Sequence, residues 1–449
     1  MGKLFGTDGV RGVANKELTP ELAFELGRAG AYVLSKRNEK PTIIIGKDTR
    51  ISGYMLEDAL SAGILSMGGN VVKAGVIPTP GIAYLVQKEN ADAGVVISAS
   101  HNPFEYNGIK FFNSKGFKLD DSVEEEIEKI ILEKIQINDH ISGELIGRMV
   151  DCAGDEQQAY VDFLTDSVHT DLKSYKIVVD CANGAAYNVA QAVFGNLDVD
   201  AEFIGVDPDG TNINENIGST HPQLLQDMVK KSKAHLGLAY DGDADRLIAV
   251  DENGEIIDGD KIMYICAKHM KEKGDLKNNL VTATVMSNIG LAKALESVGI
   301  KLQQSGVGDR YVLEMMQQTQ CVIGGEQSGH LIFLDKNTTG DGIYASLRLL
   351  NALKASGKKA SQLAAEVTVY PQVLINAKVK PENKNAYKDH KEITDSIEIM
   401  EKKMAGNGRI LIRPSGTEPL VRVMLEGKDY ESMQIMATEL AQLITAKLG

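Results

Sequence analysis

The sequence predicts an α/β fold: three similar α/β domains with mixed sheets, then a smaller C-terminal α+β domain. Apolar runs that suit buried strands alternate with segments of helical period, and polar loops follow the runs. This pattern occurs three times and then changes near the end of the chain. At 449 residues the chain is long enough for several domains.

The first predicted helix shows both a start signal and a helical period. Thr19 is placed to cap the helix and Pro20 suits its first position. Apolar residues then recur every three or four positions as far as Val33. The next element is a continuous apolar run at 42–45, ended by Gly46. Such a run between helices indicates a strand that is buried on both faces of a parallel or mixed sheet.

Five further runs resemble strand 42–45, which gives two in each of three regions. The predicted strands are 42–45 and 94–98, 175–179 and 235–239, and 280–285 and 321–323. Open α/β sheets bind ligands at the carboxyl ends of their strands, where these polar loops lie. Loops from three domains could therefore face one central cleft.

The end of the chain reads differently. Strand 373–380 precedes a polar helix that reaches about residue 404, and strands 409–412 and 420–425 precede a helix over 430–448 with an apolar stripe. The predicted domains are 1–153, 154–254, 255–368 and 369–449.

Composition excludes several classes of protein. The net charge of −14 disfavours binding to a nucleic-acid backbone, although a local basic site could still bind a small anion. No apolar window is long enough to span a membrane, and the first residues lack a signal peptide's apolar core. The four cysteines form no CxxC pair, so a disulfide framework or zinc site is not expected. We expect a cytoplasmic protein.

Residues 241–246 (DGDADR) give the clearest chemical signal. Asp241, Asp243 and Asp245 alternate after an apolar strand, so an extended backbone points them to one side. Two like charges about 4 Å apart repel by roughly 4 kcal/mol at an effective dielectric near 20, so the set favours a hard divalent cation. A solvated acidic turn is the alternative. An EF-hand is excluded because Arg246 stands where that loop needs glycine.

Ser100 lies in a second polar loop, 98–103 (SASHNP). A hydroxyl at the mouth of a strand is a plausible nucleophile, but a capping serine is the commoner explanation. The G-x-S-x-G elbow of hydrolases is absent, whereas a phosphoryl carrier needs only an accessible hydroxyl near a metal. Lys110 could return to the same site or be an ordinary surface lysine.

Three glycine-containing loops complete the set. Residues 324–330 (GGEQSGH) carry groups suited to sugar hydroxyls or an amine, or form a glycine-rich turn. Residues 413–419 (RPSGTEP) and Arg422 could surround a phosphate, or form a rigid turn; they do not match a Walker A loop. Residues 6–12 (GTDGVRG) add one more cation, Arg11, in a glycine-rich segment whose default interpretation is a turn.

The serine loop, DGDADR, GEQSGH and RPSGTEP, in this order and one per domain, resemble the α-D-phosphohexomutase family over essentially the whole chain. The resemblance implies four domains around a central cleft, with a phosphorylated Ser100. It implies these roles: Mg²⁺ ligands Ser100, Asp241, Asp243 and Asp245; sugar contacts Glu326 and Ser328; phosphate contacts Arg413, Ser415, Gly416, Thr417 and Arg422; and cleft residues Arg11, Lys110, Arg246 and His330, with Lys110 and His330 as candidates for proton transfer.

The implied reaction interconverts glucosamine 6-phosphate and glucosamine 1-phosphate through a 1,6-bisphosphate, on the route to UDP-N-acetylglucosamine. A homodimer is also implied. A sister mutase for glucose or mannose phosphates is the nearest alternative, because one glutamate could face either a hydroxyl or an ammonium at C2. A metal-dependent sugar phosphatase would not need a second phosphate clamp, and a non-catalytic sensor should lack Ser100 or one of the aspartates.

Overall fold

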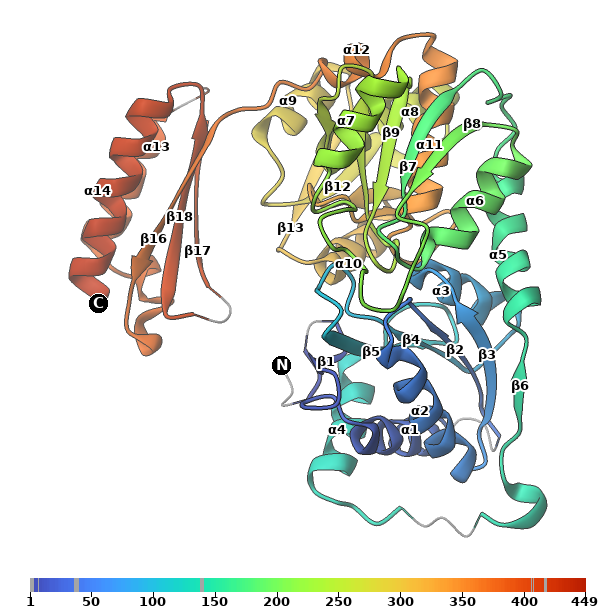
Figure 1. The fold of residues 1–449 in the computed structure, drawn as a ribbon. Helices are drawn as coiled ribbons and strands as arrows, with labels where there is room; N and C mark the ends of the chain where they lie inside the picture. The colour runs from blue at the N-terminus through green and yellow to red at the C-terminus, as the bar shows by residue number, and fades with distance from the viewer. Residues whose placement is uncertain are drawn as a thin grey trace. The chain divides into compact units, whose positions relative to one another are not determined.

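The computed structural model describes residues 4–6, 8–35, 40–137, 141–404, 406, 408–415 and 418–449. The chain divides into two compact units (Figure 1). The larger unit comprises residues 1–286 and 300–365, and the smaller unit comprises 287–299 and 366–449.

A six-stranded mixed sheet opens the larger unit, in the order β1-β5-β4-β2-β3-β6. Its strands are β1 (Val10–Val13), β2 (Thr42–Lys47), β3 (Asn70–Val76), β4 (Ala93–Ile97), β5 (Tyr106–Asn113) and β6 (Met149–Asp151). Its helices are α1 (Pro20–Ser35), α2 (Ser52–Ser66), α3 (Thr79–Lys88) and α4 (Asp121–Leu132). A short 3₁₀ turn, η1 (Gly143–Leu145), precedes β6.

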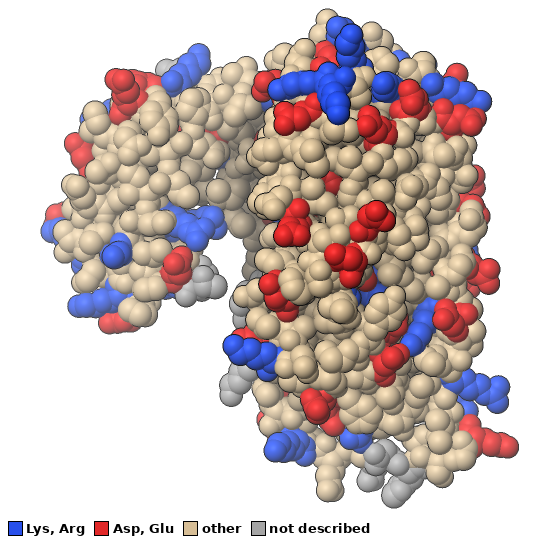
Figure 2. All heavy atoms as spheres, viewed as in Figure 1, with Lys and Arg blue, Asp and Glu red and all other residues tan. Residues whose placement is uncertain are grey.

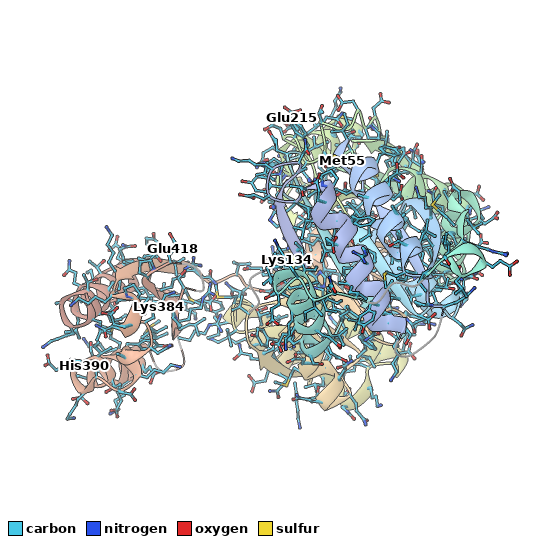
Figure 3. The ribbon with its side chains drawn as sticks, turned by 90° about the horizontal axis from the view of Figure 1, so that it is seen from below. Met55, Lys134, Glu215, Lys384, His390 and Glu418 are labelled. Carbon is cyan, nitrogen blue, oxygen red and sulfur yellow. The ribbon has the colours of Figure 1, made fainter. Side chains whose placement is uncertain are left out.

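Helices cover both faces of this sheet, which explains its continuous apolar strands. Alternate residues such as Ile43 and Ile45 pack in one core with α1, α2 and α4. The other face lies against α3, where a side chain at Gly94 would come within 2.6 Å of Val86. Helices α1 and α2 pack side by side, as Figure 3 shows around Met55. Thr19 Oγ1 accepts the N–H of Leu22 at 3.2 Å, so the predicted helix start is confirmed.

The second sheet has five strands in the order β11-β10-β9-β7-β8. The strands are β7 (Lys176–Asp180), β8 (Asp200–Ile204), β9 (Leu236–Tyr240), β10 (Leu247–Asp251) and β11 (Ile256–Ile257), and the helices are α5 (Ala153–Asp166), α6 (Ala186–Asn196) and α7 (Gln223–Ser232). Strands β7, β8 and β9 are parallel, whereas β10 and β11 are antiparallel. The carboxyl ends of β7 and β9 therefore open at one edge.

The third sheet has the order β13-β12-β14-β15. Its strands are β12 (Leu280–Thr284), β13 (Lys301–Ser305), β14 (Ile323–Gly325) and β15 (Leu331–Phe333). The helices and the 3₁₀ turn of this part are α8 (Gly259–Lys273), η2 (Lys277–Asn279), α10 (Asp309–Thr319), α11 (Gly342–Ser356) and α12 (Ala360–Ala364). The antiparallel pair β14–β15 makes this sheet mixed as well.

The smaller unit contains an antiparallel sheet with the order β16-β18-β17. Its elements are α9 (Ile289–Ser297), β16 (Gln372–Lys378), η3 (Pro381–Asn383), η4 (Ala386–Lys388), α13 (Lys391–Met404), β17 (Gly408–Pro414), β18 (Leu420–Gly427) and α14 (Tyr430–Leu448). The apolar stripe of α14, including Leu440 and Ile444, packs on the sheet in a core of its own.

The predicted fold class is confirmed: three mixed α/β sheets are followed by an α+β region. Most predicted strands agree within two residues, and the strand expected at 321–323 lies at 323–325 because Cys321 and Val322 still belong to the turn. The four domain boundaries stay predictions. No helix in the described ranges is long and apolar enough to cross a membrane. Acidic and basic side chains are interspersed on the face in Figure 2.

Candidate active site

Ser100 lies just beyond the carboxyl end of β4, every residue of which is buried. Its backbone is left-handed, with a φ of 52°, and its side chain is 2% exposed. Ser100 Oγ donates to Asp241 Oδ2 at 2.6 Å and lies 3.3 Å from His101 Nδ1. The predicted nucleophile and the predicted metal loop therefore meet.

Asp241, Asp243 and Asp245 follow β9 in a turn in which Ala244 has a φ of 55°. All three are buried, and each offers an oxygen within 4.8 Å of those of the others. Burial and the neighbouring carboxylates of Asp245 and Asp243 raise the pKa of Asp241 well above its usual range. Among the described atoms, Asp243 Oδ1 and Asp245 Oδ1 are buried without a hydrogen-bond partner. Buried unpaired oxygens that converge in this way fit a divalent cation.

Asp243 is fixed by two residues of the first sheet region. Lys110 on β5 donates to Asp243 Oδ2 at 2.9 Å, and the hydroxyl of Thr79 donates to the same oxygen at 2.7 Å. Burial alone would lower the pKa of Lys110, but Asp243 and Asp8 outweigh burial and raise it. Burial likewise opposes the ionised form of Asp243, yet Lys110 lowers the pKa of that carboxyl. Lys110 is therefore a fixed positive charge beside the site.

Two arginines lie at the same edge. The backbone N–H of Arg246 donates to Asp241 Oδ1 at 3.2 Å, and its Nε lies 3.8 Å from Asp245 Oδ1. Arg11 on β1 pairs with Asp8, and β1 lies beside β5 with Arg11 opposite Gly108. Arg246 therefore places positive charge beside the aspartates, and Arg11 shares the carboxylate of Asp8 with Lys110.

The GEQSGH loop docks directly on the start of β10. The backbones of Arg246 and His330 pair in an isolated antiparallel β-bridge, and Leu247 N–H donates to Gly329 O at 2.9 Å. A side chain at Gly329, whose φ is 95°, would come within 2.2 Å of Leu247 O, so this close approach requires glycine.

The polar groups of this loop point to different partners. His330 Nδ1 lies 3.4 Å from Asp245 Oδ2, while its Nε2 accepts the N–H of Gly340 at 3.1 Å. Glu326 Oε1 accepts the N–H of Gly308 at 3.2 Å, and Ser328 is exposed. The structure thus brings His330 to the aspartates and leaves Ser328 open to solvent.

A chain of alternating charges, which sequence reasoning missed, links Lys110 to His330. Lys110 lies 3.0 Å from Asp8, Lys118 bridges Asp8 and Asp309 at 2.6 and 2.7 Å, and Asp309 lies 3.9 Å from His330. Asp8 was visible only as part of the GTDGVRG string, and nothing near Lys118 or Asp309 signals their pairing, because they are 191 residues apart.

The predicted phosphate loop belongs to the smaller unit. Arg413 on β17 and Arg422 on β18 stand directly opposite each other, and burial and Arg422 lower the pKa of Arg413. Arg422 Nε is buried without a partner among the described atoms. Ser415 Oγ accepts the N–H of Glu418, which is labelled in Figure 3, at 3.2 Å. Like charges opposed across strands favour an anion between them. Gly416 and Thr417 lie outside the described residues.

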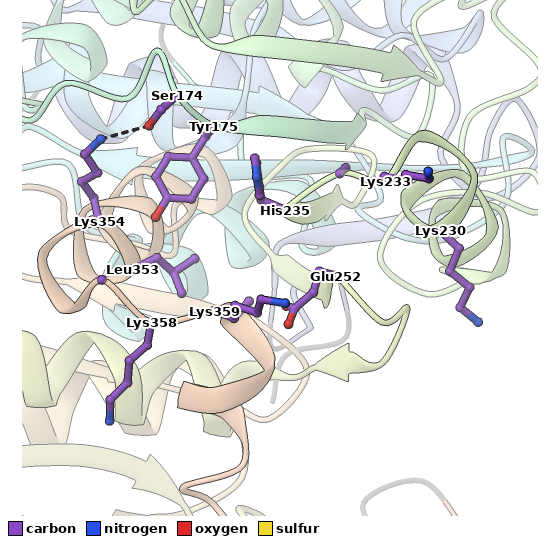
Figure 4. Close-up of a pocket in the computed structure, with 13 residues that line it drawn as sticks. Ser174, Tyr175, Lys230, Lys233, His235, Glu252, Leu353, Lys354, Lys358 and Lys359 are labelled. Carbon is purple, nitrogen blue, oxygen red and sulfur yellow. Dashed lines mark hydrogen bonds between the residues drawn. The ribbon is translucent and has the colours of Figure 1, made fainter.

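A hollow of about 540 Å³ lies at the other edge of the second sheet (Figure 4). Tyr175 and His235, which line it, immediately precede β7 and β9, so it opens at the amino ends of these strands. Its lysines are Lys230, Lys233, Lys354, Lys358 and Lys359. The ammonium groups of these lysines do not converge on one point. Lys354 donates to Ser174 Oγ at 3.0 Å, and the side chains of Lys358 and Lys230 point away from the other lining residues in Figure 4. This hollow is separate from the site at the carboxyl ends.

A cavity of about 410 Å³ beside Asp309 contains an acid with a shifted pKa, Glu124. Burial and nearby Asp121 raise the pKa of Glu124 to about 7. Because the pKa of Glu124 is higher in the folded than in the unfolded chain, its protonated form stabilises the fold. This stabilisation is complete below the ordinary pKa of a glutamate and is lost as the pH rises through about 7. We expect Glu124→Gln to be as stable as the parent at pH 4.5 and more stable by about 1 kcal/mol at pH 8, after solvent screening is allowed for.

Urea unfolding at both pH values measures this difference. The control is Glu125→Gln, which changes an exposed neighbour on the same helix. A gain in stability for Glu124→Gln that is equal at the two pH values would contradict the assignment of the shifted pKa.

Comparison with known proteins identifies the family. Sequence models of the phosphoglucomutase/phosphomannomutase family match residues 2–138 (alpha/beta/alpha domain I), 158–254 (domain II), 258–370 (domain III) and 374–443 (C-terminal domain). The phosphoglucosamine mutases of Thermoanaerobacter sp. and Caldanaerobacter subterraneus subsp. tengcongensis are 58% and 57% identical to this chain over 449 residues, which is the full length of each chain.

Solved structures show the same fold at lower identity. A phosphoglucomutase/phosphomannomutase family protein of Burkholderia thailandensis has a TM-score of 0.81 at 24% identity, covering 99% of this chain and 98% of the other. Aspergillus fumigatus N-acetylphosphoglucosamine mutase, in complex with GlcNAc-6P and magnesium, has a TM-score of 0.67 at 17% identity, covering 100% and 96%. The matches to all four domain models and the full-length relatives together show that this chain belongs to the phosphoglucomutase/phosphomannomutase family, the α-D-phosphohexomutases.

Proposed function

We propose that this chain interconverts glucosamine 6-phosphate and glucosamine 1-phosphate, with Ser100 as the carrier of the phosphoryl group. The observation that carries the proposal is the contact of 2.6 Å between Ser100 Oγ and Asp241, inside a buried aspartate triplet next to Lys110. The full-length relatives named phosphoglucosamine mutase support the choice of glucosamine.

Mg²⁺ is the proposed metal, held by Asp241, Asp243 and Asp245 together with the phosphate on Ser100. Three carboxylates are hard oxygen donors, and two of them keep a buried oxygen without a partner. When bound, Mg²⁺ would offset the negative charge that a phosphoserine adds to the aspartates and that builds up on the transferring group.

The reaction we propose moves one phosphoryl group out and takes another back. Phospho-Ser100 loses its phosphoryl group to the O1 hydroxyl of glucosamine 6-phosphate, whose proton passes to a base, and the bond from phosphorus to Ser100 Oγ breaks. The resulting 1,6-bisphosphate turns over, and Ser100 Oγ takes the phosphoryl group from O6, which regains a proton. Lys110, Arg246 and Arg11 supply positive charge to these steps.

His330 is the proposed proton carrier. Lys110 was the other candidate, but two carboxylates hold it protonated, so it suits charge stabilisation better than proton acceptance. His330 also lies beside two carboxylates, with Nδ1 3.4 Å from Asp245 Oδ2 and Nε2 3.9 Å from Asp309 Oδ2. Burial lowers its pKa, but these acids outweigh burial and raise it to about 9, so His330 exchanges its proton much closer to neutral pH than Lys110 does.

Sugar and phosphate recognition are assigned to two further loops. Glu326 and Ser328 are the proposed sugar contacts. Arg413, Ser415 and Arg422 are proposed to hold the phosphate that is not being transferred, since the two arginines stand opposite each other and only a long contact of 3.8 Å joins Arg422 to Glu418 among the described residues. The same role is proposed for Gly416 and Thr417. The predicted domain boundaries, a cytoplasmic location and a homodimer are further proposals, and light scattering on the purified protein tests the last.

Rates on four substrates test the choice of sugar. We expect kcat/KM for glucosamine 6-phosphate to exceed those for N-acetylglucosamine, glucose and mannose 6-phosphates by at least about tenfold, because only the ammonium at C2 of glucosamine can form a charge-assisted hydrogen bond with a carboxylate such as Glu326. A higher value for glucose or mannose phosphate would identify a sister mutase instead.

Two further measurements separate the mutase from a phosphatase. Mass spectrometry should find a stable addition of about 80 Da on Ser100, which corresponds to one phosphate. Inorganic phosphate should not accumulate in proportion to turnover. Stoichiometric release of phosphate would favour the phosphatase.

A further inference from the structure

Two backbone carbonyls of the serine loop are each held by the same pair of side chains. Arg50 Nη2 donates to Ser100 O at 3.0 Å and to Asn102 O at 2.5 Å. Asn214 Nδ2 donates to the same two oxygens, at 3.0 and 3.2 Å. The two carbonyls thus receive four hydrogen bonds, from Arg50 in the loop after β2 and from Asn214 in the loop after β8.

The held segment has an unfavourable backbone conformation. Ser100 has a φ of 52°, which is uncommon for a residue with a side chain. Ser98 Oγ accepts the N–H of Ser100 at 3.0 Å, so both polar backbone groups of Ser100 are bonded. If the donors to its carbonyl were lost, the peptide after Ser100 could rotate towards a more favourable conformation. Such a rotation would move the hydroxyl away from Asp241.

Neither donor can move easily. Arg50 is 0% exposed and forms a buried ion pair with Asp48, whose Oδ1 also accepts the N–H of Arg50 at 3.0 Å. Asn214 is 8% exposed, and its own N–H donates to Ala182 O at 2.9 Å. Gly242 packs closely against the hydrogen bond from Asn214 to Ser100 O. A side chain at this position would come within 2.5 Å of Ser100 O and 2.9 Å of Asn214 Nδ2.

We infer that Arg50 and Asn214 are positioning residues: by holding the carbonyls of Ser100 and Asn102, they keep the phosphate-carrying hydroxyl aimed at the aspartate triplet. The inference rests on the proposed role of Ser100. Asn214 belongs to the second sheet region, which also supplies the metal loop. Its hydrogen bonds therefore fix the position of the serine loop relative to the aspartates. Neither residue needs to touch the substrate.

Asn214 can be tested with a matched control in its own loop. Asn214 and Asn216 have the same backbone conformation, with φ values of 59° and 57°, but Asn216 is exposed. Replacing either residue by alanine removes an asparagine from a left-handed position, so backbone strain is matched. Only Asn214→Ala removes the two hydrogen bonds to the serine loop.

We expect Asn214→Ala to lower kcat by about 10- to 100-fold with KM changed by less than about twofold, as a shift of the nucleophile without loss of substrate contacts requires. Asn216→Ala should keep both constants within about twofold. The rate of phosphoryl transfer from phospho-Ser100 to glucosamine 6-phosphate in a single turnover should fall as kcat does. Asn214→Ala should melt at a lower temperature than Asn216→Ala because it loses two hydrogen bonds of a buried side chain, but it should stay folded at the assay temperature.

Arg50→Lys is the second variant, since lysine keeps a positive charge beside Asp48 but lacks the guanidinium fork that reaches both carbonyls. It should show the same separation of kcat from KM. Equal kcat for Asn214→Ala and Asn216→Ala, with parental kcat in Arg50→Lys, would overturn the inference. The inference would also be overturned if the loss of kcat in these variants were fully explained by the fraction of the protein that is unfolded. A phosphate that maps to a residue other than Ser100 would instead defeat the proposed function, whichever result the asparagine variants give.

Discussion

Ser100→Ala is expected to lower mutase turnover by at least about 10⁴-fold, which is the scale seen when an enzyme loses its nucleophile. The substitution removes the protein atom that carries the phosphoryl group in the proposed reaction. It also removes the hydroxyl that donates to Asp241 Oδ2 at 2.6 Å. The fold should persist, because the carbonyl contacts of Arg50 and Asn214 do not involve the side chain of Ser100.

A coupled assay for glucosamine 1-phosphate measures this loss, and circular dichroism checks the fold. Ser114→Ala is a suitable control because Ser114 is exposed in the turn after β5. The addition of about 80 Da should disappear from Ser100→Ala and remain in the control. Parental turnover in Ser100→Ala would show that the phosphoryl group is carried elsewhere.

Asp241→Asn and Asp243→Asn are expected to lower activity alike but to change stability in opposite directions. Each removes a carboxylate from the triplet, and turnover should fall by about 10²- to 10³-fold or more. Asp241 accepts the hydroxyl of Ser100 at Oδ2 and the backbone N–H of Arg246 at Oδ1. An asparagine can accept the Arg246 N–H with its oxygen and donate its amide to the Ser100 hydroxyl oxygen, since a hydroxyl both donates and accepts. Without metal, Asp241→Asn should therefore be at least as stable as the parent, because charge repulsion among the three carboxylates falls.

Asp243→Asn should be less stable by about 2 kcal/mol, because Lys110, only 2% exposed, loses the carboxylate at 2.9 Å and keeps only Asp8 at 3.0 Å. Thermal unfolding with chelator and with Mg²⁺ measures both effects. Mg²⁺ should raise the melting temperature of the parent and raise it much less in either variant. A destabilised Asp241→Asn protein without metal, or an undiminished response to Mg²⁺, would contradict this account of the site.

The sequence predicts the parts of this molecule that depend on local pattern. The run Ile43–Ile45 indicates a buried strand because helices cover both faces of the sheet, and Thr19 with Pro20 predicts where α1 begins. The aspartate triplet is visible because three carboxylates two residues apart are costly without a cation. These inferences need only neighbours in the chain.

Contacts between distant segments were not predictable in the same way. Asn214 lies in a loop whose composition suits any turn, and its partner Ser100 is 114 residues away. Lys110 could be recognised as part of the site only through the resemblance, since one lysine on a strand is normally a surface residue. Arg50 lies in the polar loop that follows β2, but nothing in the sequence of that loop shows that its guanidinium is fully buried.

Helix α9 gives the smaller unit an unusual covalent attachment. Residues 287–299 belong to this unit although they interrupt the third sheet region in sequence, so the chain passes between the units three times. Within the smaller unit, Glu426 accepts the N–H of Ile289 at 3.1 Å, and Asn288 donates to Tyr370 O at 3.0 Å. A gene fragment that starts at residue 369 would omit α9 and leave the carboxylate of Glu426 without one of its donors. Anyone exchanging this region between related enzymes should therefore transplant residues 287–299 with it.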